Sequence, residues 1–83
     1  MSRLLILKDP ATTIAHHGDY MEVKTPHHSY VVAYRHIKTI YINKAINLSI
    51  AECYAISTRV PLYLIDKHGY LLAKVEKVDD ESV

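Results

Sequence analysis

Short apolar runs separated by turn residues recur along most of the chain. Runs that are rich in β-branched and aromatic residues, and that end at Gly, Pro, Asn or Asp, are typical of strands. The pattern predicts seven strands, over Arg3–Lys8, Thr12–His16, Tyr20–Lys24, Tyr30–Tyr34, Thr39–Ile42, Pro61–Ile65 and Tyr70–Val75. The residues between the fourth and fifth strands, Arg35–Lys38, fit either a strand or a short turn of helix.

One stretch departs from the strand pattern and predicts a helix over about residues 48–58. Ser49 and Glu52 have the S-x-x-E spacing of a capping box, in which each residue satisfies a backbone N–H group at the start of a helix. The helix is expected to end before Val60, because a residue that precedes a proline, here Pro61, is pushed towards an extended conformation.

Seven strands in a chain of 83 residues cannot form one open sheet without leaving apolar faces bare. The expected fold is therefore α+β or mainly β, a small two-sheet β-sandwich with one helix. A chain of this size forms one domain and buries roughly 60% of its unfolded surface. We assign residues 1–78 to this domain and residues 79–83 to an acidic tail or linker.

The charge is uneven although the formal net charge is only +1. Residues 1–75 hold nine basic and five acidic residues, a net charge of +4, and residues 76–83 hold one basic and four acidic residues, a net charge of −3. A mildly basic body of this kind does not by itself indicate a nucleic-acid-binding protein. The single cysteine, Cys53, excludes an internal disulfide, and the apolar run at the N-terminus is too short for a signal peptide, so a cytoplasmic protein is expected.

Six histidines are an excess for this length and raise the question of a metal site. Four of them form the adjacent pairs His16–His17 and His27–His28, and neighbours on a strand point to opposite faces. The spacings that usually hold a metal, such as H-x-H and H-E-x-x-H, are absent from the sequence. Exposed loop histidines are therefore expected and no metal site is predicted, with a weak metal-binding or pH-sensing site as the alternative.

Tyrosines and basic residues interleave between Tyr30 and Lys44, which makes this region the candidate for nucleic-acid binding. Arg35, Lys38 and Lys44 are expected to contact phosphates, and Tyr41 to stack on a base or a sugar. The alternative is a solvated sheet edge whose tyrosines pack a dimer face. For that face we expect the side chains that share one side of the fourth strand, Tyr30, Val32 and Tyr34.

The order of these elements resembles the N-terminal β-domain of the CRISPR-associated spacer-acquisition integrase, the first universal protein of CRISPR adaptation. The resemblance covers residues 3 to about 77 and lies in ordered spacing rather than in one motif. The residues that match the family pattern are Ile37, Ile40, Ile42, Leu48, Ser49, the strand Val60–Asp66, Gly69, Leu71 and Val75. The turn Asn43–Ala45 departs from that pattern, since the family often has a glycine there.

The resemblance implies a non-catalytic domain that forms a homodimer and helps to build a platform for duplex DNA together with the second adaptation protein. The family's catalytic residues and its divalent metal lie in a helical second domain, so no catalytic residue and no cofactor is expected in this chain. Two other function classes stay open. One is a stand-alone nucleic-acid-binding or regulatory domain that uses the Tyr/Arg/Lys patch, and the other is a histidine-based metal protein.

Overall fold

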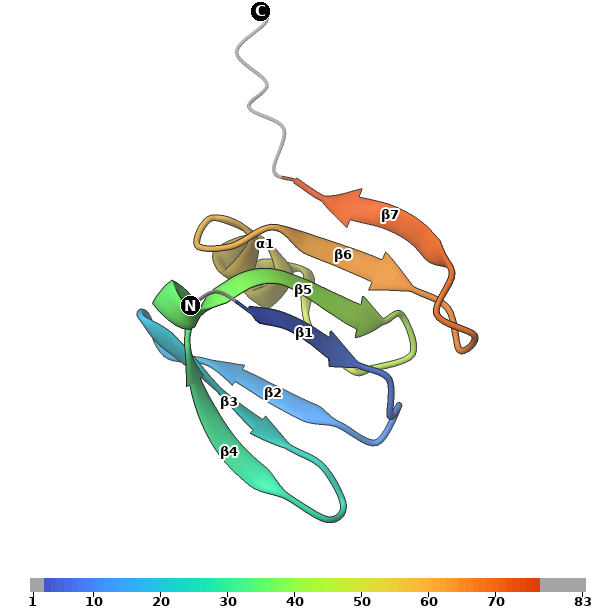
Figure 1. Cartoon of the computed structure of the whole chain (residues 1–83), viewed down its shortest axis with the longest axis horizontal. Helices are drawn as coiled ribbons and strands as arrows, with labels where there is room; N and C mark the ends of the chain where they lie inside the picture. The colour runs from blue at the N-terminus through green and yellow to red at the C-terminus, as the bar shows by residue number, and fades with distance from the viewer. Residues whose placement is uncertain (1–2, 77–83) are drawn as a thin grey trace, which may run out of the picture.

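The computed structural model describes residues 3–76, which fold into seven strands, a 3₁₀ turn and one α-helix (Figure 1). The elements are β1 (Arg3–Leu7), β2 (Thr13–His16), β3 (Tyr20–Lys24), β4 (Ser29–Ala33), η1 (Tyr34–His36), β5 (Ile37–Asn43), α1 (Ile50–Ser57), β6 (Leu62–Ile65) and β7 (Leu71–Val75). The predicted mainly β fold with one helix is confirmed. Both structures that fit Arg35–Lys38 occur. The helical turn covers Tyr34–His36, and β5 begins at Ile37, two residues earlier than predicted.

The strands form two sheets. Sheet A contains β1, β5, β6 and β7 in that order, and sheet B is the antiparallel meander β2-β3-β4. In sheet A, β1, β5 and β6 are parallel, whereas β7 returns antiparallel to β6. A parallel neighbour needs a crossover connection, and α1 supplies it between β5 and β6. The carboxyl ends of β1, β5 and β6 therefore lie at one edge of the sheet (Figure 1).

The core lies between the two sheets and is closed on one side by α1, which contacts β2, β6 and β7. Each layer contributes side chains that are almost fully buried, and together they form one apolar cluster. The largest of these side chains are Met21 and Val23 of sheet B, Ile40, Ile42 and Leu62 of sheet A, and Ile56 of α1. Burial of one such side chain contributes on the order of 1.5–3 kcal/mol, so this cluster is the main source of stability in a domain this small.

The helix begins at the predicted cap. Ser49 has an extended backbone and its Oγ accepts a hydrogen bond from the backbone N–H of Glu52 at 3.1 Å. The same hydroxyl donates to the Glu52 carboxylate at 3.2 Å. One half of the capping box is thus formed as expected, whereas the glutamate binds the serine hydroxyl and not the serine N–H.

The turn between β6 and β7 is organised by Asp66. Its Oδ1 accepts hydrogen bonds from the backbone N–H groups of His68 and Tyr70, both at 2.9 Å. Gly69 follows with a φ of 89°, a left-handed conformation that costs a glycine little and most other residues considerably more. These contacts fix where β7 starts and hence its register on β6.

No helix within residues 3–76 is long and apolar enough to cross a membrane. The predicted acidic tail, residues 79–83, lies outside the described residues.

Candidate interaction surfaces

One row of side chains runs across the outer face of sheet A, the face that is turned away from sheet B and α1. The strand register places Ile6 beside Tyr41, Tyr41 beside Tyr63, and Tyr63 beside Lys74. The two tyrosine rings stack with centroids 5.4 Å apart, and the Lys74 ammonium lies 6.0 Å from the centre of the Tyr63 ring. We call this row the tyrosine ladder; cross-strand pairs of this kind stabilise a sheet by about 0.2–1 kcal/mol each.

The outer face of sheet A is apolar as well as accessible. Leu4 and Ile6 of β1 are 57% and 51% exposed, and Leu72 of β7 is 48% exposed. Monomeric soluble proteins rarely expose a contiguous apolar patch of this kind unless it binds a partner. Tyr63 of β6 is half-buried on this face.

The structure places the residues of the predicted dimer face, Tyr30, Val32 and Tyr34, on β4 and in η1. Tyr30 lies opposite Val23, and Val32 lies opposite Met21. Val23 and Met21 are fully buried, so Tyr30 and Val32 lie on the side of β4 that faces the core, with 36% of Tyr30 still exposed. Their strand shows an equally apolar pattern on its two sides, and the sequence therefore gave no signal for which side faces inward.

Tyr34 was expected on the same face but lies in the 3₁₀ turn, with only 4% of its surface exposed. On β4 the side chain that is presented to solvent is Val31, which is 60% exposed.

The four predicted nucleic-acid contacts do not form one patch. Arg35 lies in the 3₁₀ turn, and Lys38 is left unpaired by a β-bulge at the start of β5, because Arg3 pairs with Ile37 and Leu4 with Thr39. Lys44 follows the other end of the strand, about 20 Å from Lys38 at the usual rise per strand residue.

Tyr41 lies between these two ends, in the middle of the ladder. One face of its ring packs on Tyr63, and that face is closed to a nucleic-acid base. Sequence analysis missed Ile6, Tyr63 and Lys74 as members of this surface. They lie on three different strands, and no local sequence pattern predicts how these strands pair.

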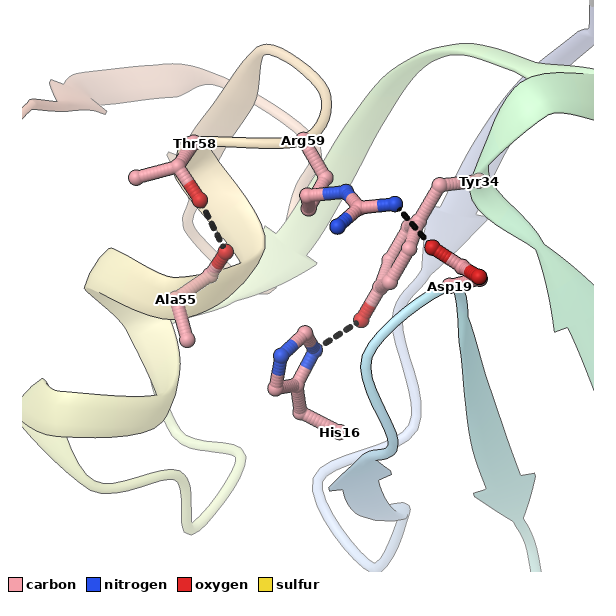
Figure 2. A network of polar contacts seen from close by, with 6 residues as sticks. All are labelled: His16, Asp19, Tyr34, Ala55, Thr58 and Arg59. Carbon is pink, nitrogen blue, oxygen red and sulfur yellow. Dashed lines mark hydrogen bonds and ion pairs between the residues drawn. The ribbon is translucent and has the colours of Figure 1, made fainter.

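A polar network joins sheet B to the 3₁₀ turn and to the loop that follows α1 (Figure 2). The hydroxyl of Tyr34 and Nδ1 of His16 share a hydrogen bond of 2.7 Å. Arg59, in the loop that follows α1, forms an ion pair with Asp19 and places its guanidinium carbon 6.0 Å from the centre of the Tyr34 ring. The backbone N–H of Tyr34 donates to the carbonyl of Asp19 at 3.0 Å. The network therefore ties β2, the β2–β3 turn, η1 and the exit of α1 together.

Burial raises the pKa of Tyr34 to about 12, and the cation of Arg59 opposes that rise. The phenol is consequently neutral at physiological pH and is available as a hydrogen-bond partner. Burial also raises the pKa of the Cys53 thiol, with a smaller contribution from the Glu52 carboxylate. A thiol with a raised pKa is a weak nucleophile, and Cys53 packs against the core as a small, partly buried side chain.

The histidines are dispersed over the molecule. His17 stacks on Tyr20 with ring centroids 5.1 Å apart, and His27 and His28 lie in the β3–β4 loop. Within residues 3–76 no group of three or more His, Cys, Asp or Glu residues comes close enough to hold a metal ion. Asp19 and Glu22, the acidic residues of the β2–β3 hairpin, form ion pairs with Arg59 and Lys24.

Comparison with known proteins gives a match in structure only. No family model and no curated protein matches the sequence. Among solved structures, a chain of a partial Cas6-RT-Cas1–Cas2 complex superposes with a TM-score of 0.74 at 14% sequence identity, over 94% of this chain. This chain has the fold of part of a Cas1 protein. A CAS1 protein from Thermotoga maritima superposes with a TM-score of 0.70 at 13% identity, over 89% of this chain.

The resemblance that was identified from the sequence is thus confirmed at the level of the fold. The chain spans about a quarter of the length of both matched chains, 24% in each case. The match therefore shows the fold of this chain and does not extend to the activity or partners of the whole Cas1 proteins.

Proposed function

We propose that this chain is the β-domain of a CRISPR adaptation integrase of the Cas1 type, and that it acts as a dimerisation and DNA-platform module without catalysis of its own. The observation that carries the proposal is the superposition on Cas1-containing chains over 94% and 89% of the residues. The superposition holds at only 13–14% identity, so the likeness lies in the fold.

The outer face of sheet A supports the dimerisation part of the proposal. Its exposed aliphatic side chains surround a rigid pair of stacked tyrosines, and tyrosine is enriched in protein interfaces because its ring packs while its hydroxyl stays hydrated. We therefore propose that a second copy of the chain covers Leu4, Ile6 and the tyrosine ladder. This surface replaces the predicted face on β4, whose Tyr30 and Val32 point inward.

The distribution of charge supports the DNA part. The strands of sheet A, the loops that follow β1, β5 and β6, and Glu76 hold six basic and three acidic residues, a net charge of +3, whereas the rest of residues 3–76 holds three of each, a net charge of zero. The six basic residues are Arg3, Lys8, Lys38, Lys44, Lys67 and Lys74, and the three acidic ones are Asp9, Asp66 and Glu76. Phosphate contacts supply most of the affinity in non-specific DNA binding, so duplex DNA is expected to bind at the loop ends of sheet A, beside the face that the second copy covers.

Catalysis and the second partner are proposed from the resemblance. The family's metal-binding residues belong to a helical domain, and α1, of eight residues, is the one α-helix within residues 3–76. One of the matched structures is a complex that contains Cas2. We accordingly propose Cas2, the second adaptation protein, as a partner of this chain.

Light scattering after size-exclusion chromatography, combined with duplex-DNA binding at two salt concentrations, tests the proposal. A dimer whose affinity for DNA falls steeply between 50 and about 200 mM salt supports it. A monomer that binds DNA would favour the stand-alone nucleic-acid-binding domain instead. Nicking of DNA by the purified chain in the presence of a divalent metal, abolished by a chelator, would contradict the non-catalytic assignment.

A further inference from the structure

The parallel part of sheet A brings three lysines that are distant in sequence to one end of the molecule. Lys8 follows β1, Lys44 follows β5, and Lys67 lies in the turn after β6. Parallel strands end at the same edge, and in sheets of this kind ligands bind outside the carboxyl ends of the strands. A shallow hollow is formed there, and its lining includes Lys8, Asn43, Lys44, Asp66, Lys67 and His68.

A buried asparagine holds the rim of this hollow in place. Asn43 is 4% exposed, and its Nδ2 donates to the carbonyl of Lys8 at 2.8 Å. Its Oδ1 accepts from the backbone N–H of Ala45 at 2.9 Å. A single side chain thereby ties the loop after β1 to the loop after β5, which fixes the spacing between Lys8 and Lys44.

The third loop is positioned against Lys8. The Cε and Nζ atoms of Lys8 lie 4.0 Å from the point that a Cβ atom on Gly69 would occupy. The lysine side chain therefore reaches across sheet A and lies against the β6–β7 turn that holds Lys67. The three loops form one preorganised basic rim rather than three independent side chains.

The charges of this rim are not neutralised by ion pairs. Among residues 3–76 the ion pairs are Lys24–Glu22, Arg59–Asp19 and Lys74–Glu76, and none involves Lys8, Lys44 or Lys67.

Two carboxylates lie nearby, and each is engaged with the backbone of its own turn. Asp66 accepts from the N–H groups of His68 and Tyr70, and Asp9 accepts from the N–H of Ala11 at 2.9 Å. Three lysines against these two carboxylates leave the rim with a surplus of positive charge.

We propose that this hollow binds a phosphate group of a nucleic-acid strand, with Lys8, Lys44 and Lys67 as its ligands. Lysine ammonium groups serve as point-charge ligands for phosphate, and they need no base-specific geometry. The inference rests on the proposed DNA-platform function and deepens it, since it assigns the contact to one end of sheet A. Free phosphate shares this chemistry, so the experiment has to separate the two sources.

The test is a titration of the ¹⁵N-labelled chain, followed by two-dimensional NMR, with duplex oligonucleotide and separately with pyrophosphate. Both ligands are expected to shift the backbone amides of Lys8, Lys44, Lys67 and His68. The double variant Lys44→Gln/Lys67→Gln should lose these shifts and lower the slope of log affinity against log salt by about 2 for the duplex. Its unshifted core amides report that it is folded.

The matched control is Arg35→Gln/Lys38→Gln, which removes the same charge at the other end of β5. It should keep the pyrophosphate shifts around the hollow. If the wild-type chain binds duplex and Lys44→Gln/Lys67→Gln binds it with the same affinity and salt slope, the inference fails while the proposed function stands. Shifts with pyrophosphate and none with duplex would overturn both the nucleic-acid assignment and the proposed DNA contact.

Discussion

The hydroxyl of Tyr34 and Nδ1 of His16 lie 2.7 Å apart and connect the 3₁₀ turn before β5 to the last residue of β2. Tyr34 is buried, and its ring also lies beside the guanidinium of Arg59 from the far end of α1. One tyrosine thus contacts three segments that are separated in sequence. Such a residue stabilises the placement of sheet B against the end of α1 as well as its own turn.

Replacement of Tyr34 by Phe removes this hydrogen bond and keeps the ring beside Arg59. The loss of one hydrogen bond in a buried site should lower the free energy of unfolding by about 1 kcal/mol. Urea unfolding, followed by circular dichroism, measures the change. The control is Tyr54→Phe on α1, because Tyr54 is 37% exposed and its hydroxyl makes no hydrogen bond to another described residue. A Tyr34→Phe variant as stable as Tyr54→Phe would show that the contact contributes nothing.

Tyr34 also predicts how stability depends on alkaline pH. Its pKa is raised to about 12 in the folded chain, above the ordinary value of 10.0, so the unfolded chain loses the phenolic proton first. The stabilisation that comes from the protonated phenol of Tyr34 is fully present below pH 10 and is lost as the pH rises towards 12. The wild-type chain should lose more stability over that window than Tyr34→Phe does. Equal losses in the two proteins, measured by urea unfolding at several pH values, would contradict the assignment.

The local elements of this fold were predictable, whereas their long-range pairing was not. Alternation and β-branched content located all seven strands, and Ser49 with Glu52 located the start of the helix, because these signals act within a few residues. The pairing of β1 with β5 joins residues more than thirty positions apart, and β1 is apolar on both of its faces. Nothing local therefore indicated that Ile6 lies beside Tyr41.

The same limitation applies to the candidate site residues. Tyr30 and Val32 share one side of β4, as alternation predicted, but the choice of the inner side depends on the partners Val23 and Met21. Lys44 was grouped with Lys38 because the two are near in sequence. A seven-residue strand separates them in space, and the parallel topology groups Lys44 with Lys8 and Lys67 instead.

Asn43 offers a test of how the basic rim is organised. Asn43→Ala removes a buried amide that bridges Lys8 and Ala45, and it should lower the free energy of unfolding by about 1–3 kcal/mol because two backbone groups lose their partner. Hydrogen exchange at the amide of Ala45 should accelerate. Asn47→Ala is the matched control, since Asn47 is exposed and should change stability by less than about 0.5 kcal/mol.

Asp66 should make the stability of the folded chain depend on pH in the acid range. Hydrogen bonds from the backbone N–H groups of Tyr70 and His68 lower its pKa below the ordinary value of 3.8. Because its pKa is lowered on folding, the Asp66 carboxylate stabilises the folded chain above pH 3.8. This stabilisation is lost as the pH falls through the pKa of the folded state. Asp66→Asn should therefore flatten the acid limb of the stability profile. An acid limb that stays as steep in Asp66→Asn as in the wild-type chain would refute the role of Asp66.

A single substitution that introduces a charge tests the proposed dimer surface. Ile6 is 51% exposed beside Tyr41 on the outer face of sheet A, so Ile6→Glu places a carboxylate in the middle of the proposed interface without entering the core. A buried and unpaired charge is costly, and the dimer should dissociate at least tenfold more readily by light scattering across a dilution series. Val31→Glu is the control, because Val31 is 60% exposed on the outer face of sheet B. Dissociation caused by Val31→Glu and not by Ile6→Glu would move the interface to β4, the strand on which the sequence had placed it.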